Sequence, residues 1–151
     1  MINESIYVVS NTVITNPVNA MNISQFGTGF YCFKNIKDAL EHASDKDSIL
    51  NSYKLNYNST ELKILKFDNI NTYWLDFILF TRNYDINYYD IIEGPIIVED
   101  IKPYIEQLFN GTISREFLLN KLKSLKSIPQ VCYKTHKALQ TIKYIKHKKY
   151  K

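Results

Sequence analysis

The segment QFGTGFYCF, Gln25–Phe33, holds two of the four glycines in a chain of 151 residues and leads directly into an aromatic run. Gly27 and Gly29 predict a tight turn, because glycine adopts backbone conformations that other residues avoid. The run that follows, residues 29–33, has the aromatic composition that is typical of a strand. We therefore expect a turn that leads into a core strand of the sheet.

Alternation along this strand divides its side chains between two faces. Phe30 and Cys32 share one face, and Tyr31 and Phe33 share the other, because successive side chains of a strand point in opposite directions. Phe30 and Cys32 are predicted to be core. The pair on the opposite face is either core as well or the lining of a cleft.

Outward from this strand, hydrophobic periodicity predicts strands and helices along the whole chain. Asn35 precedes a helix with apolar positions at helical spacing and is predicted to cap it. A polar loop is expected over residues 11–25, and Gly94 and Pro95 are expected to interrupt a strand. The other expected strands are 6–10, 52–57, 61–67, 89–98, 130–134 and 142–149, and the expected helices are 35–43, 71–82, 98–109, 114–125 and 135–139. This order predicts a single α+β domain over residues 1–151.

Composition excludes several classes of protein. Hydrophobic residues make up 45% of the chain, which indicates a globular protein rather than a disordered one. Cys32 and Cys132 lack the spacing and the partner ligands of a zinc site, so no metal is expected. The sequence shows neither an apolar run of about 20 residues nor a signal peptide. We expect a cytoplasmic protein with reduced thiols and no membrane partner.

Charge is concentrated at the C-terminal end. The formal net charge is +4, and the last nine residues, KYIKHKKYK, carry five lysines. This basic segment either contacts the phosphate backbone of a nucleic acid or protects an edge strand against aggregation.

Common catalytic motifs are absent from the sequence. It contains no phosphate-binding Walker loop, no GxSxG and no HExxH, and GTGF does not complete a GxGxxG fingerprint. His42, His136 and His147 occur singly and are interpreted as surface residues. Glu99 and Asp100 stand where a helix begins and are interpreted as stabilising its positive end.

The order of the segments, however, is similar to that of a known family. The resemblance rests on Tyr7–Asn11 (YVVSN), Phe26–Tyr31 (FGTGFY) with the helix at residues 39–43, Trp74–Phe77 (WLDF), Arg82, Tyr89–Pro95 (YDIIEGP), Gln130–Tyr133 (QVCY), Thr135 and Ala138–Leu139. It covers nearly the whole chain. The sequence resembles a bacterial family of unknown function within the ADP-ribosyltransferase superfamily, whose folds are diphtheria-toxin-like or poly(ADP-ribose)-polymerase-like.

The resemblance implies a split mixed β-sheet with flanking helices, whose cleft binds NAD as the substrate. Tyr31 would stack on the nicotinamide ring, and Gln130 would hydrogen-bond the nicotinamide ribose. The first strand would hold the nicotinamide amide through the backbone of Val8, Val9 and Ser10.

The resemblance also places further residues around the cofactor. Gly27 and Gly29 would shape the entrance, and Arg82 would contact a phosphate. By its position in the sequence alone, Arg82 is interpreted as a cation that stabilises the negative end of a helix.

The first strand departs from the family. Where the family reads approximately Tyr-His-Gly-Ser, this chain reads Tyr7-Val8-Val9-Ser10. Val8 has no hydrogen-bonding side chain, and Val9 adds bulk where glycine would admit the ligand. Two functions are therefore expected. One is a mono-ADP-ribosyltransferase of a macromolecule, such as the toxin of a toxin–antitoxin pair with a cognate antitoxin, or an effector. The other is a degenerate module that binds a protein or a nucleic acid.

Overall fold

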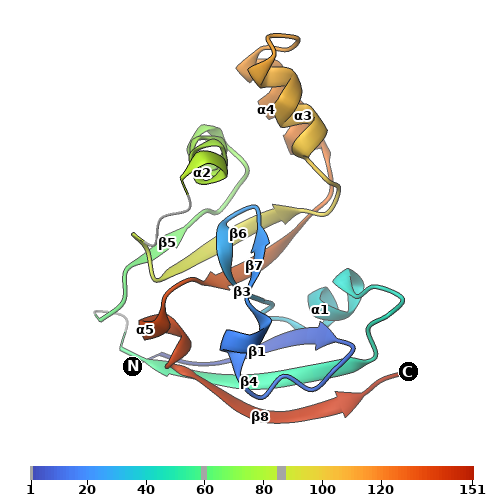
Figure 1. Ribbon diagram of the computed structural model, residues 1–151, viewed down its shortest axis with the longest axis vertical. Coiled ribbons are helices and arrows are strands. Elements are labelled where there is room, and N and C mark those ends of the chain that lie inside the picture. The colour runs from blue at the N-terminus through green and yellow to red at the C-terminus, as the bar shows by residue number, and fades with distance from the viewer. Residues whose placement is uncertain (1, 59–60, 85–87) are drawn as a thin grey trace.

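Strands from both ends of the chain and helices from its middle make an α+β fold, as the sequence predicts (Figure 1). The computed structural model describes residues 2–58, 61–84 and 88–151. Its elements are β1 (Ile2–Ser10), the 3-10 helix η1 (Pro17–Ala20), β2 (Asn22–Ser24), β3 (Gly27–Cys32), α1 (Ile36–His42), β4 (Ile49–Tyr57), β5 (Ile64–Lys66), α2 (Thr72–Asn83), β6 (Ile91–Ile97), α3 (Lys102–Phe109), α4 (Arg115–Ser124), β7 (Ser127–Tyr133), α5 (His136–Leu139) and β8 (Ile142–Lys149).

One sheet joins the first and the last strands of the chain. β4 lies between β1 and β8, and both pairings are antiparallel. Ile6, Tyr53 and Ile142 from this sheet pack with Phe30 and Tyr133 from the other sheet in a shared core. β8 is an edge strand, and Figure 1 shows it at the outer side of the sheet.

The second sheet has the order β2-β3-β7-β6-β5 and is mixed, because β5 pairs with β6 in parallel and the other pairings are antiparallel. β2 was not expected, since its residues lie in the predicted polar loop. Its side chains are all exposed, so hydrophobic periodicity gives no signal for it. The turn decides its pairing: Gly27 adopts φ +86° and folds β2 back onto β3.

β6 corrects another expectation, because the strand runs without interruption through Gly94 and Pro95. Pro95 lies directly opposite Pro129 of β7. Neither proline has an N–H, and a pair that exchanges no hydrogen bonds tolerates both. The Pro95 carbonyl accepts a hydrogen bond from Trp74 Nε1 at 2.8 Å instead.

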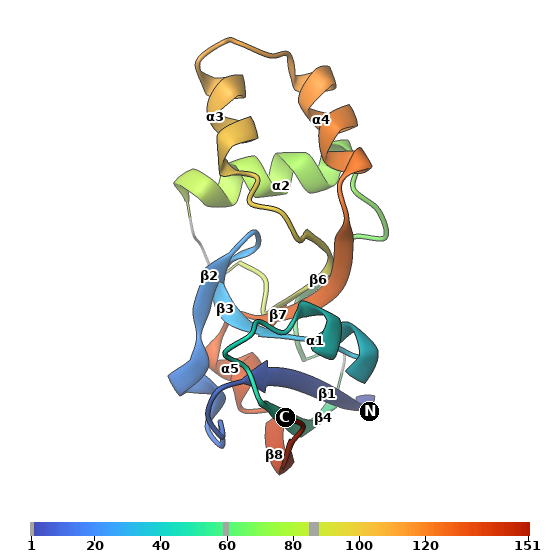
Figure 2. The ribbon, with the colours of Figure 1, turned by 90° about the vertical axis from the view of Figure 1, so that its right-hand side faces the viewer.

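The helices α2, α3 and α4 gather on one face of the five-stranded sheet. Trp74, Leu75 and Ile78 of α2 are buried there with Ile92 and Ile96 of β6. α3 and α4 contribute Ile105 and Leu118 to the same core, and Figure 2 shows these two helices standing side by side above α2. In the part of the chain that the structure describes, no helix is both long and apolar enough to cross a membrane.

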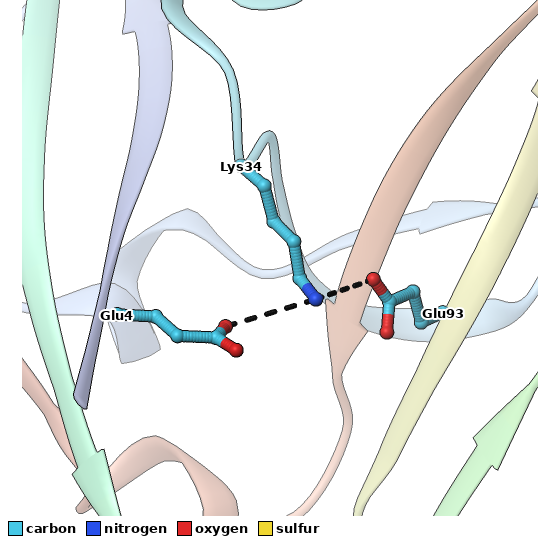
Figure 3. A network of polar contacts seen from close by, with 3 residues as sticks. All are labelled: Glu4, Lys34 and Glu93. Carbon is cyan, nitrogen blue, oxygen red and sulfur yellow. Dashed lines mark ion pairs between the residues drawn. The ribbon is translucent and has the colours of Figure 1, made fainter. Parts of the chain in front are cut away.

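Among the residues that the structure describes, the two sheets meet at one backbone bridge. Tyr7 N–H donates to the Phe33 carbonyl at 2.8 Å, and Phe33 N–H donates to the Tyr7 carbonyl at 2.9 Å. Next to this bridge, Lys34 Nζ lies 2.5 Å from a Glu93 carboxylate oxygen of β6 and 3.7 Å from a Glu4 carboxylate oxygen of β1 (Figure 3). These ion pairs link the two sheets on the side where they diverge.

Candidate functional site

Tyr31 and Gln130 project from the same face of the five-stranded sheet. Tyr31 lies directly opposite Cys132. Gln130 is two residues from Cys132 on β7, and residues two apart on a strand share a face. The two predicted residues are therefore diagonal neighbours across β3 and β7, within reach of each other for long side chains.

The first strand reaches this face through Val9. Phe33, Ala39 and Ile128 form a small buried cluster, and the side chains of Tyr7, Val9 and Leu50 pack against it. We call these six residues the junction cluster. Ile128 precedes Gln130 by two residues, and Phe33 follows Tyr31 by two. Val9 thus lies on the side of the molecule to which Tyr31 and Gln130 also point.

The backbone of Val9 points to an open edge of β1. Tyr7 exchanges both of its backbone hydrogen bonds with Phe33, so its N–H and C=O face away from β4. Hydrogen-bonding direction alternates along an antiparallel strand, so the N–H and C=O of Val9 face the same way. Beyond the bridge at Tyr7, β1 has no further backbone partner on that side among the described residues.

Val8 and Ser10 have other roles. The Val8 side chain packs into the core on the opposite face of β1. Its carbonyl accepts a hydrogen bond from Asn51 Nδ2 at 3.3 Å, and the same nitrogen donates to Ser10 Oγ at 2.8 Å. Ser10 Oγ in turn donates to the Thr12 carbonyl. Of the three predicted first-strand residues, only Val9 joins Tyr31 and Gln130.

The Tyr31 hydroxyl is bonded to the turn that precedes its own strand. It donates to the Gly27 carbonyl at 2.5 Å and accepts from Phe26 N–H at 3.0 Å. Burial raises the pKa of the Tyr31 phenol well above its ordinary value, and the neighbouring Cys132 thiol adds to the rise. The phenol therefore stays protonated. Tyr31 as a whole is half-buried, and its side chain packs against the core that includes Phe26 and Cys132.

Gln130 is a buried polar residue whose side chain is 5% exposed. Among the described residues, none forms a hydrogen bond with its amide. The fully buried side-chain atoms without a partner are the hydroxyls of Tyr133 and Tyr150, so the Gln130 amide is not fully enclosed. An amide in such a place retains two N–H donors and a carbonyl acceptor for a ligand.

Gly27 and Gly29 shape the turn and the strand next to it. Lys134, which is 2% exposed, donates from Nζ to the Phe26 carbonyl at 2.8 Å and to the Thr28 carbonyl at 2.9 Å. With the Tyr31 hydroxyl, this ammonium holds three successive carbonyls of the turn toward the interior. At Gly29, a Cβ would overlap Cys132 Sγ, so only glycine lets β3 lie this close to β7.

A groove of about 700 Å³ opens beside these residues. It lies between the hairpin turn of β2 and β3, the ends of α1, α2 and β6, and the start of α3. Its lining includes the predicted residues Gly27 and Arg82, together with Ile23, Ser24, Gln25, His42, Ile78, Thr81, Ile96, Ile97, Val98, Glu99, Asp100, Ile101, Lys102 and Ile105.

Three links connect the groove with Tyr31 and Gln130: a hydrogen bond, a strand pairing and a ring contact. The Gly27 carbonyl accepts from the Tyr31 hydroxyl. Ile96 lies on the face of β6 that carries Gly94, and Gly94 is the direct partner of Gln130. His42 packs its ring on Phe33 of the junction cluster, with ring centroids 5.3 Å apart. The groove is therefore adjacent to the predicted site.

Cations and carboxylates lie together in the groove. Arg82 Nη2 is 4.0 Å from Glu106 Oε1, a distance that leaves the guanidinium weakly paired, and its side chain is 30% exposed. Asp100 Oδ1 accepts from the N–H of Lys102, the first residue of α3, at 3.0 Å. Glu99 accepts from the Tyr104 hydroxyl at 2.6 Å. Arg82 and Lys102 are the two cations that a phosphate in this groove would meet.

His42 is exposed, which confirms the surface position that the sequence predicts, but sequence reasoning did not place it at the groove. It lines the groove from the last turn of α1. Partial burial of His42 lowers the pKa of its imidazole. The carboxylate of Asp47 has the smaller, opposite effect and raises the pKa. The sequence contained one signal for this position: the apolar spacing of the helix after Phe33 includes Ala39, and His42 follows Ala39 by three residues, about one helical turn.

Over the described ranges, no group of three or more His, Cys, Asp or Glu side chains is placed to hold a metal ion. Cys32 and Cys132 are buried and free.

Comparison with known proteins gives a family match. The family model described as "Protein of unknown function (DUF3990)" matches residues 5–144. No curated protein matches the chain, and no solved structure does.

Proposed function

The chain belongs to the family described as "Protein of unknown function (DUF3990)", and we propose that it acts as an NAD-dependent mono-ADP-ribosyltransferase on a macromolecular target. The proposal extends to an ADP-ribosyltransferase-like fold, which the sequence resemblance supports together with the two diverging sheets. Modification of a host-cell component as a toxin or effector is the biological role that we infer.

The observation that carries the proposal is that Tyr31, Gln130 and Val9 lie on the same side of the two sheets. They are next to a groove whose lining includes Gly27 and Arg82, although none of the three lines it directly. These residues come from three strands that lie far apart in the chain, and the resemblance assigns all three to the same ligand. The groove volume of about 700 Å³ is within the range of about 300–1,000 Å³ that is usual for ligand sites.

The residues present fit a dinucleotide. Arg82 and Lys102 would face its phosphates. The Tyr31 ring would supply the aromatic group that stacks on nicotinamide, and the Val9 N–H and C=O offer the donor and acceptor that an amide group needs.

NAD supplies an activated glycosidic bond, and the residues of the chain would orient it. Gln130 would hold the ribose by hydrogen bonds from its amide and, unlike a glutamate, would add no negative charge where positive charge develops. A slower reaction than that of a glutamate-bearing site is expected for this reason.

A second function, a degenerate binding module, is favoured by a different observation. The Val9 side chain packs against the junction cluster in a position where the family pattern has glycine. Val8 offers no polar side chain, and the Tyr31 hydroxyl is already bonded within the protein. In this alternative the fold is kept and NAD is not turned over.

Incubation of the protein with labelled NAD and a cell lysate tests the first function against the second. Label transfer or nicotinamide release by the wild type, lost in Gln130→Ala, supports the transferase. Gln107→Ala, on an exposed face of α3, is the matched control and should react like the wild type. If the wild type gives no transfer, no nicotinamide release and no thermal shift with NAD, the first function is wrong.

A further inference from the structure

Four lysines lie on one face of the three-stranded sheet. Lys54 of β4 stands directly opposite Lys143 of β8. Lys146 and Lys148 stand opposite Ser52 and Leu50, which share the face of Lys54. All four lysines are exposed, and we call them the basic face.

A register irregularity produces this arrangement. Strict alternation along β8 would place Lys143 and Lys146 on opposite faces of the sheet. The register shifts between Ser52 and Tyr53, and the extra residue of β8 at this point is Ile145. Because the bulge absorbs one residue, the lysines on either side of it point the same way.

The charge on this face is not neutralised. None of the four lysines forms an ion pair with any residue that the structure describes. The formal net charge of the chain is +4, which equals the charge of these four lysines, so the remainder of the chain is formally neutral. The basic face thus carries a formal charge equal to the net charge of the whole chain.

Protection of the sheet edge accounts for the lysines of β8 but not for Lys54. β8 is the edge strand, but β4 is enclosed between β1 and β8, so Lys54 protects no edge. Like charges directly opposite each other on neighbouring strands destabilise a sheet. The pair of Lys54 and Lys143 thus opposes stability, and a negatively charged partner would relieve the repulsion.

We propose that the basic face binds the phosphate backbone of a nucleic acid without sequence preference. Lys146 and Lys148 are two residues apart, which is about 6.7 Å along a strand, or about two nucleotide steps of roughly 3.4 Å. Ser5 and Ser52 lie beside the lysines on this face. Ammonium and hydroxyl groups are the donors that bind phosphate oxygens, whereas a membrane interface selects large apolar side chains.

The test is binding of a fluorescein-labelled 20-base-pair duplex, followed by fluorescence anisotropy in about 50 to 200 mM KCl without NAD. Four phosphate contacts predict a slope of about −3.6 in a plot of log K against log salt, and each lysine removed should reduce the slope by about 1. The double variant Lys54→Gln/Lys146→Gln should therefore bind more weakly and show a slope of about −1.8.

The control is Lys123→Gln/Lys137→Gln, which makes the same change in net charge on α4 and α5 and should bind like the wild type. Equal loss in both variants, or no binding of the duplex at 50 mM salt, would overturn the proposal. So would capture of the protein by phosphatidylserine vesicles without binding of the duplex. A thermal melt of each variant confirms folding, and because NAD is absent, a negative result leaves the proposed function untouched.

Discussion

The side-chain amide of Gln25 is hydrogen-bonded at both ends to the backbone of Ile97. Gln25 Nε2 donates to the Ile97 carbonyl at 2.9 Å, and Ile97 N–H donates to Gln25 Oε1 at 3.0 Å. Ile97 is the last residue of β6, on the edge where β5 has already ended. The amide therefore takes the place of a neighbouring strand and attaches the hairpin turn to the wall of the groove.

Replacement of Gln25 by alanine should loosen this attachment. Two hydrogen bonds are lost and two backbone groups of Ile97 lose their partners, which predicts a decrease in the free energy of unfolding of about 1–3 kcal/mol. Urea denaturation measures it. Gln140→Ala, at an exposed position beside α5, should change stability much less, and an equal decrease in both variants would contradict the role of Gln25.

Tyr31→Phe removes the hydroxyl of this residue and keeps its ring, so the variant tests the two groups separately. The Gly27 carbonyl and Phe26 N–H lose their hydrogen bonds to the hydroxyl, so a decrease in stability of about 1–3 kcal/mol is expected. The ring is retained, so any NAD-dependent thermal shift should survive in Tyr31→Phe and disappear in Tyr31→Ala. If both variants are folded and both lose the NAD-dependent thermal shift, the hydroxyl rather than the ring contacts the ligand.

Gly29→Ala tests the close approach of β3 to β7. The added Cβ would overlap Cys132 Sγ and lie 3.0 Å from the Tyr133 carbonyl oxygen, so a destabilisation of about 1–3 kcal/mol is expected. The double variant Gly29→Ala/Cys132→Ala should recover part of the loss, because the sulfur is gone. Thermal melts of the single and double variants decide this. Absence of any recovery would locate the strain at the Tyr133 backbone.

The imidazole of His42 predicts a pH dependence of stability. Its pKa in the folded protein is lowered, mainly by burial, so the unfolded chain binds the proton more readily than the folded one. Stability should therefore fall as the pH drops through the ordinary histidine pKa of about 6.5 and level off below the folded-state pKa. Urea denaturation at pH 5, 6, 7 and 8 measures the decrease.

The variant His42→Asn should flatten this dependence between pH 5 and 7. His136→Asn, an exposed position in α5, serves as the control and should retain the wild-type profile. If the wild type and His42→Asn show the same slope of stability against pH, another group is responsible and His42 does not carry the effect.

Local signals in the sequence were sufficient for most of the helices. Asn35, Asn71, Ser114 and Thr135 were predicted at helix starts, and each side chain accepts a backbone N–H two or three residues later. A cap needs only its own neighbours in the chain, so its residue type and position predict it. β2 and the uninterrupted β6 could not be predicted, because partners elsewhere in the sheet stabilise them.

The sequence by itself determined the α+β class, the strand after QFGTG and the division of its side chains between two faces, since these depend on local propensity and alternation. Only the tertiary structure decided that Gln130 shares the face of Tyr31, that His42 meets the groove, and that Lys54 joins the lysines of β8. Each of these depends on the register between segments far apart in the chain. A shift of one residue in register turns every following side chain to the other face, and no local pattern specifies where such a shift occurs.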